Sequence, residues 1–272
     1  MSLIKNIFSF YISSNLHIAF AIFCITKITL LAYDIDDNLI PLFNFFSTLL
    51  VYNFIRFYQI YGLNFNSKQW VKNKSKSLIL LNAISIVVLI YFAFQIRFQA
   101  LVLLSPFVLA AIFYVVPLSL SIKNLRSVAS LKLFLIAITC AGVTVLFPLI
   151  ENSIQFSFDV WILFIQRFLF IIAITIPFDI RDVHLDSPDL RTLPQTIGIK
   201  KSKIIGSLSL LIFFALGFLM IPIDKTTVLI TFLVSLVSFL FLIFSSSNQG
   251  KYYSSFWVES IPIYWFILVV VF

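Results

Sequence analysis

Three aspartates in one polar segment of the chain have a spacing that suits a metal or phosphate site. Asp179, Asp182 and Asp186 are separated by three and four residues, so one helical face would carry all three carboxylates. Carboxylates this close repel one another unless a cation lies among them. Mg²⁺ takes one or two carboxylates together with phosphate oxygens and waters, which suits a diphosphate ligand. We therefore expect these three residues to be Mg²⁺ ligands.

Basic residues in the same segment could bind phosphate oxygens that a metal leaves uncovered. They are Arg181, Arg191, Lys200 and Lys201. Arginine in particular binds phosphate through two parallel hydrogen bonds. The alternative interpretation is a solvated loop in which acidic and basic side chains pair with each other. Spacing alone leaves both interpretations open.

The elements that position this segment must lie in a membrane. Of the 272 residues, 61% are hydrophobic and 11% are charged, against about half and a quarter in soluble domains. Nine apolar runs have the length of a membrane-spanning helix, which needs roughly 20 residues. These runs cover residues 12–33, 39–61, 77–96, 99–117, 128–149, 159–178, 204–222, 227–246 and 255–272. They predict a single membrane domain over residues 1–272.

The basic residues predict how the helices are oriented. With the N-terminus in the cytoplasm, the outer connecting segments hold only Arg97 and Lys225. The inner segments hold Lys5, Lys68, Lys72, Lys74, Lys76, Lys123, Arg126, Arg181, Arg191, Lys200, Lys201, Lys203 and Lys251. Such an excess is typical of cytoplasmic segments. The net charge of +8 is therefore a topology signal and not a nucleic-acid patch.

Four ionisable residues lie well inside the apolar runs: His17, Lys27, Arg167 and Glu259. A charge inside a membrane is a candidate functional group, because burying it unpaired is costly. Arg167 and Glu259 could instead form an ion pair between helices, and Lys27 could extend toward the acidic segment at 34–37. We interpret all four as structural.

The aspartate segment resembles the second Asp-rich motif of the UbiA family of membrane prenyltransferases. The resemblance rests on Asp-x-x-Asp-x-x-x-Asp at 179–186, on Arg-Thr-Leu-Pro at 191–194, and on a glycine two residues before the basic pair at 200–201. It implies an all-α membrane bundle of nine helices with a cytoplasmic N-terminus. Members transfer an isoprenoid from its diphosphate to an aromatic or quinone-precursor acceptor, with Mg²⁺ held by two Asp-rich motifs. It also implies catalytic roles for Asp179 and Asp182.

Further residues match other parts of the family pattern. Tyr114 ends the fourth expected span, and Lys123 and Arg126 follow it, similar to a Tyr-plus-Lys element of the family. The resemblance implies that these three side chains bind the diphosphate together with Arg181 and Arg191.

The first Asp-rich motif of the family is missing from this chain. Where the family has Asn-Asp-x-x-Asp-x-x-x-Asp, the chain keeps Asn53 but has Phe54, Phe57 and Tyr61 in place of the aspartates. One of the two Mg²⁺ sites is therefore expected to be absent. Arg56 is the candidate replacement, because a guanidinium binds phosphate without a metal; alternatively, it extends to the membrane interface. The resemblance implies that Asn53 contacts the acceptor or the phosphate as a catalytic residue.

Two functions from different classes follow. The first is isoprenoid transfer to a membrane-soluble acceptor, in a bacterial inner membrane with the active-site segments facing the cytoplasm. The second is a catalytically silent relative that binds an isoprenoid or lipid phosphate. Both involve membrane lipid, and neither needs nucleic acid or an obligate protein partner. A transporter is less favoured, because the polar residues gather at one face and do not line a path.

Overall fold

The computed structural model describes residues 2–60, 65–115, 131–187, 190–220 and 224–272, and within these ranges the chain is helical without strands. Its helices and helical turns are α1 (Ser2–Ser13), α2 (Leu16–Leu31), α3 (Leu39–Ile60), α4 (Phe65–Ala93), α5 (Phe98–Val115), α6 (Leu131–Ala141), η2 (Gly142–Leu146), α7 (Phe147–Glu151), α8 (Phe158–Arg181), α9 (Leu193–Ile197), α10 (Ile199–Leu216), η4 (Gly217–Leu219), α11 (Lys225–Phe244), η5 (Tyr253–Val258) and α12 (Ile261–Val271). A backbone surrounded by lipid must satisfy its hydrogen bonds within each segment, so apolar runs of this length become helices.

Each of the nine expected spans corresponds to a helix or to adjoining helices. In the described residues, seven helical segments are long and apolar enough to cross a membrane. The other two expected spans correspond to the shorter apolar helix α5 and to the bent pair of α1 and α2. The structure therefore confirms the predicted all-α membrane bundle.

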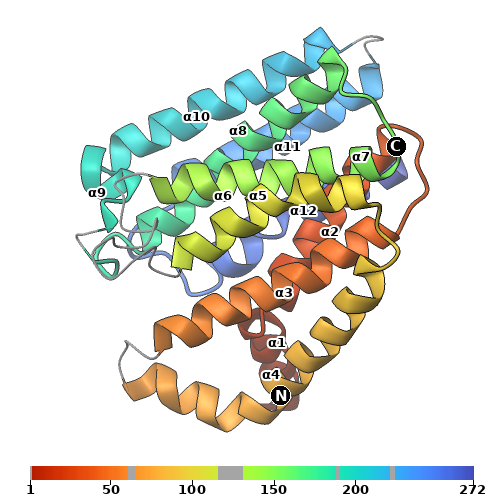
Figure 1. The fold of residues 1–272 in the computed structure, drawn as a ribbon. Helices are drawn as coiled ribbons and strands as arrows, with labels where there is room; N and C mark the ends of the chain where they lie inside the picture. Colours follow the sequence, from red (N-terminus) through yellow and green to blue (C-terminus); the bar gives the residue numbers. More distant parts are fainter. Residues whose placement is uncertain (1, 61–64, 116–130, 188–189, 221–223) are drawn as a thin grey trace.

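The first expected span differs from the prediction, because it is divided into two helices. α1 and α2 meet at an angle of 61°. Between them, Asn15 has a left-handed backbone conformation with φ of 65°, which asparagine adopts more readily than most residues. The helix that begins at Ser2 therefore turns away from the axis of α2 (Figure 1).

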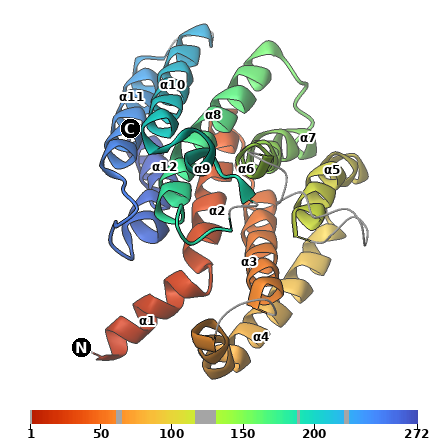
Figure 2. The same ribbon diagram turned by 90° about the vertical axis from the view of Figure 1, so that its left-hand side faces the viewer.

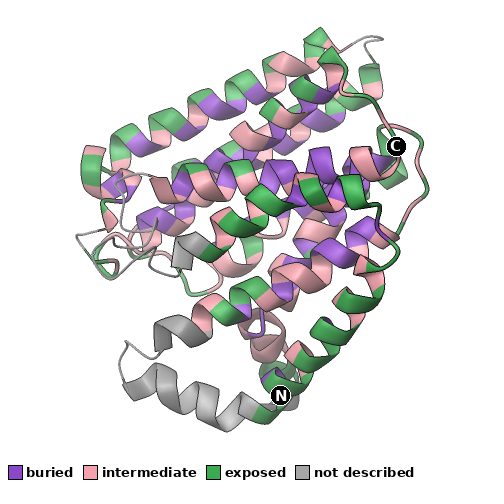
Figure 3. Ribbon diagram, in the orientation of Figure 1, coloured by how far each residue is buried: buried purple, intermediate pink, exposed green. Residues whose placement is uncertain are grey.

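α8 lies at the centre of the bundle. Figure 2 shows α10, α11 and α12 on one side and α3, α4 and α5 on the other, with α2, α6 and α8 between them. Phe170 of α8 packs against Phe213 and Trp265, with ring centroids 5.6 and 5.2 Å apart. Figure 3 shows exposed residues along the helices of the bundle. Many of the exposed residues are large and apolar. An exposed apolar surface of this extent is expected where helices face lipid.

Arg167 is fully buried in the middle of α8. Its guanidinium donates to the backbone oxygen of Ile25 at 2.6 Å and to the hydroxyl groups of Thr29 and Thr144 at 3.1 and 3.5 Å. Its Cζ atom lies 5.1 Å from the ring centroid of Trp265. This one side chain therefore joins α2, the π-helical turn η2, α8 and α12.

Candidate functional site

The candidate site lies at the end of the bundle that the charge bias predicts to be cytoplasmic. α8 ends at Arg181 with Asp179 in its last turn, and Asp182 and Asp186 follow in the connecting segment. α6 begins at Leu131 and packs antiparallel to α8, so the start of α6 faces the end of α8. We call this region the predicted cytoplasmic end.

The ammonium group of Lys132 lies between two of the three aspartates. Its Nζ atom is 2.7 Å from Oδ1 of Asp179 and 3.5 Å from Oδ2 of Asp186. The side chain of Asp179 is 1% exposed and that of Lys132 is 14% exposed, so the pair is shielded from solvent. A carboxylate buried to this extent needs a charged partner, because the loss of its hydration is costly.

Asp182 forms a second ion pair with its neighbour Arg181. Nε and Nη2 of Arg181 donate to the two carboxylate oxygens at 2.8 and 2.7 Å, which is a bidentate arrangement. The guanidinium also lies over the ring of Phe178, with Cζ 5.4 Å from the ring centroid. Together these contacts fix the direction of the arginine at the end of α8.

Three asparagines join α2, α3 and α4 where the first Asp-rich motif was expected. Nδ2 of Asn15 donates to Oδ1 of Asn53 at 2.9 Å, and Nδ2 of Asn53 donates to Oδ1 of Asn82 at 2.9 Å. Arg56 donates from Nη2 to Oδ1 of Asn15 at 3.0 Å. Asn53 is only 1% exposed. Both the oxygen and the nitrogen of its side-chain amide are therefore used to link helices.

Glu259 directly follows the π-helical turn η5. The ion pair suggested between Glu259 and Arg167, both of which the structure describes, does not form. Arg167 bonds instead to uncharged groups of α2 and η2.

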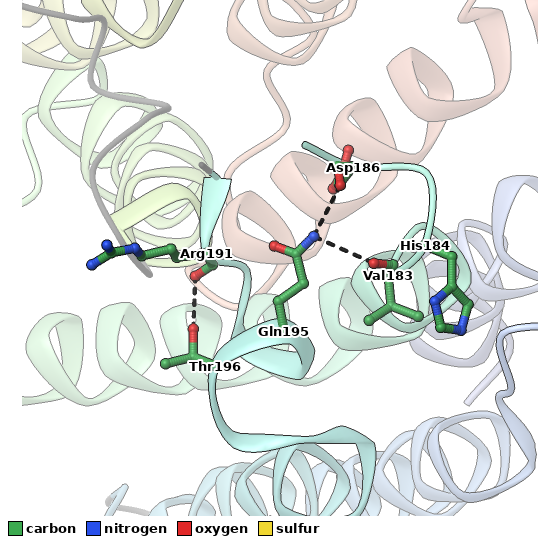
Figure 4. A pocket seen from close by; sticks show the side chains of 6 residues that line it. All are labelled: Val183, His184, Asp186, Arg191, Gln195 and Thr196. Atoms are coloured by element: carbon green, nitrogen blue, oxygen red, sulfur yellow. Dashed lines mark hydrogen bonds between the residues drawn. The ribbon is translucent and has the colours of Figure 1, made fainter. Parts of the chain in front are cut away.

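The segment after α8 folds around a pocket. The pocket has a volume of ≈ 590 Å³ and is lined by Val183, His184, Asp186, Arg191, Gln195 and Thr196 (Figure 4). Nε2 of Gln195 donates to the backbone oxygens of Val183 and Asp186 at 3.3 and 3.0 Å. The hydroxyl of Thr196 donates to the backbone oxygen of Arg191 at 3.0 Å. The guanidinium of Arg191 is exposed and points away from Gln195 (Figure 4).

No protein-family model matches this chain, and no curated protein matches it. Among solved structures, the apo structure of a UbiA homolog from Aeropyrum pernix K1 superimposes on it with a TM-score of 0.68. The match covers 94% of this chain and 97% of that chain, at 16% sequence identity. The chain has a UbiA-like fold. At this identity the match shows the fold, and the chemistry must be argued from the residues of this chain.

The UbiA-like fold brings many of the predicted site residues to the predicted cytoplasmic end. Four of them, Asp179, Asp182, Asp186 and Arg181, gather where α8 ends, and Arg191 lines the adjoining pocket. Asn53 and Arg56 lie in the asparagine network.

Several residues that the sequence analysis singled out have a backbone or side chain that the structure does not describe. Lys123, Arg126 and Tyr61 are outside the described residues. Tyr114 and Phe57 lie in α5 and α3, but their side chains are not among those described. The predicted roles of Tyr114, Lys123 and Arg126 stay predictions.

The positions of the three aspartates in this structure do not suit the binding of Mg²⁺. In the described residues, no group of three His, Cys, Asp or Glu side chains is placed to hold a metal ion. Lys132 bonds to Asp179 and Asp186, while Asp182 faces Arg181. Mg²⁺ requires oxygen ligands in a near-octahedral arrangement, whereas here an ammonium group lies between two of the carboxylates.

The sequence did not point to three residues that take part in these contacts: Asn15, Asn82 and Lys132. The sequence signal for Lys132 is weak, because a single lysine near the start of an apolar run is commonly an interface anchor. Glu259 gave a stronger signal as an acidic residue within a span, but its partner was predicted wrongly.

Replacing Asn53 with Leu should lower the free energy of unfolding by about 1–3 kcal/mol. The substitution leaves Nδ2 of Asn15 and Oδ1 of Asn82 without the partner that Asn53 provides. Thermal unfolding of the protein purified in detergent measures the effect. Asn248→Leu is the matched control, because Asn248 is exposed. Equal unfolding midpoints for the two variants would contradict a linking role for the asparagine network.

Proposed function

We propose that this chain binds an isoprenoid diphosphate at the predicted cytoplasmic end and transfers the isoprenoid to an aromatic or quinone-precursor acceptor in the membrane. The observation that carries the proposal is the pair of cations held by aspartates at the end of α8. Lys132 bonds to Asp179 and Asp186, and Arg181 bonds to Asp182. In a UbiA-like fold, these are two oriented cationic donors at the end of the bundle where the resemblance implies that the diphosphate binds.

The transfer step needs positive charge at the leaving group. The bond between C1 of the isoprenoid and the diphosphate oxygen breaks, and both electrons leave with the diphosphate. C1 then bonds to the acceptor, which loses a proton to solvent. Preorganised cations that stabilise the developing charge are usually the largest contribution to such catalysis. Arg181 and Lys132 are the cationic donors in the proposal, and Arg56 and Arg191 are further cations at this end of the bundle.

Two of the aspartates act in this proposal by positioning the cations. Asp182 fixes the guanidinium plane of Arg181 through two hydrogen bonds. Asp179 holds the ammonium group of Lys132 at 2.7 Å. The proposed location is a bacterial inner membrane. Because the basic residues gather at this end, the proposal has the site facing the cytoplasm and the N-terminus inside.

A second candidate function is a catalytically silent relative that binds an isoprenoid or lipid phosphate. The observation that favours it is that all three aspartates of the second motif are already engaged by cations, while the first motif has lost its aspartates. Both candidates bind the same ligand, and they differ only in turnover.

Release of diphosphate from farnesyl or geranylgeranyl diphosphate should occur with wild-type protein in lipid nanodiscs containing a pool of quinone precursors. Parallel assays in Mg²⁺ and in EDTA measure whether the release depends on a divalent metal. Asp182→Asn should lower the rate at least about tenfold, because the neutral amide no longer holds Arg181 as an ion pair. Lys225→Gln at the opposite end of the bundle is the control and should leave the rate unchanged.

The outcomes separate the two candidates. Binding of farnesyl diphosphate without release would support the silent relative. If the Asp182→Asn variant releases diphosphate at the wild-type rate, the site assigned here is wrong. Absence of both binding and release would leave the UbiA-like fold without the proposed ligand.

A further inference from the structure

We infer that Lys132 takes the place of a divalent cation at the end of α8, so that the phosphate site works without a bound metal. The ligand in this inference rests on the proposed function. The statement about the metal rests only on the side chains of this chain and can be tested separately.

The first argument is geometric. Nζ of Lys132 contacts carboxylate oxygens of Asp179 and Asp186, at 2.7 and 3.5 Å. These residues are seven positions apart in the chain and come together across the end of α8 and the following segment. The ammonium group therefore occupies the position that a metal shared by the two carboxylates would take. An ammonium group has three N–H donors, and the two carboxylates engage it as a metal would be engaged by its ligands.

The second argument concerns burial. Asp179 is 1% exposed and Lys132 is 14% exposed, measured on their side chains. For a divalent ion to enter, the ammonium group would have to leave both carboxylates and lose its partners in a shielded place. Removing one partner of a buried ion pair is strongly unfavourable. The resident lysine therefore competes with any metal from within the chain.

The third argument is that basic side chains also supply positive charge at other positions of the two motifs. Where the first motif would bind a second metal, this chain has Arg56, bonded to Asn15 at 3.0 Å. At the other motif, Arg181 is fixed by Asp182. Arginine binds phosphate directly and stays charged at every physiological pH. Basic side chains thus replace metal at both motif positions, which is a consistent change and not an isolated loss.

The test uses full-length protein in nanodiscs and two probes, Mn²⁺ as the divalent ion and farnesyl diphosphate as the ligand. Electron paramagnetic resonance of free Mn²⁺ should detect no stoichiometric uptake by the wild type. The affinity for farnesyl diphosphate should agree within about twofold between EDTA and Mg²⁺. Neither measurement needs a variant, so the test survives if a substitution prevents folding.

Variants of Lys132 sharpen the test. Lys132→Met should lower the affinity for farnesyl diphosphate in EDTA by at least about tenfold, whereas Lys132→Arg, which keeps the charge, should remain within about threefold of wild type. Lys132→Ala frees the carboxylates and should create Mn²⁺ uptake. Adding Asp179→Asn to Lys132→Ala should remove that uptake again.

Two results would overturn the inference. One is stoichiometric Mn²⁺ uptake by the wild type that Asp179→Asn abolishes. The other is ligand binding that EDTA removes and Mg²⁺ restores. If farnesyl diphosphate does not bind under any condition, the proposed function fails, and the Mn²⁺ measurements still decide the inference about Lys132.

Discussion

Arg181→Met should lower the affinity for farnesyl diphosphate by about 100-fold. Hydrogen bonds to charged groups contribute about 1.5–3 kcal/mol each, so the loss of even one or two of them reaches this size. Arg181 is the group best prepared to make such bonds, because Asp182 and the ring of Phe178 already fix its direction. Little entropy is then lost when phosphate binds. Equilibrium binding to nanodisc-embedded protein in EDTA measures the effect.

Two controls separate the geometry of Arg181 from its charge and from the overall charge of the protein. Arg181→Lys keeps the charge but loses the planar fork, so its affinity should fall less than that of Arg181→Met. Arg97→Met removes an exposed arginine at the other end of the bundle and should leave the affinity unchanged. Equal affinities for wild type and Arg181→Met would remove this arginine from the site.

Arg167→Ala should lower the free energy of unfolding by about 2–5 kcal/mol, the range found when a large buried side chain is truncated. The substitution empties a fully buried volume in the centre of α8. It also removes the hydrogen bonds to Ile25, Thr29 and Thr144 and the contact with Trp265. Thermal unfolding in detergent should show a midpoint lower by at least about 5 °C.

A second substitution at this position separates packing from charge. Met fills much of the same volume without a charge, and replacing buried charged groups by apolar ones is often neutral or stabilising. Recovery of the wild-type midpoint in Arg167→Met would therefore assign the effect of Arg167→Ala to lost volume. A low midpoint in both variants would assign it to the hydrogen bonds. Lys225→Ala, at an exposed position, is the control, and a wild-type midpoint for Arg167→Ala would contradict the prediction.

The membrane-spanning helices were determined by the sequence itself. An apolar run of about 20 residues becomes a helix in lipid because its backbone can satisfy its hydrogen bonds only locally. The position of the aspartate segment directly after α8 follows from the same local pattern, and the UbiA-like fold confirms the resemblance at the level of architecture. The bend before α2 was missed, because it depends on the left-handed conformation of a single residue, Asn15.

The partners of the polar side chains were decided only by the tertiary structure. Lys132 and Asp179 are 47 positions apart. Asn15 directly precedes α2, whereas Asn53 lies on α3 and Asn82 on α4. Which polar groups meet inside a bundle depends on how helices rotate and pack against one another, and no local spacing encodes this. For the same reason, the expected partner of Arg167 was wrong. The sequence therefore determined which chemical groups reach the end of the bundle. Helix packing decided that Lys132 lies between two of the aspartates there.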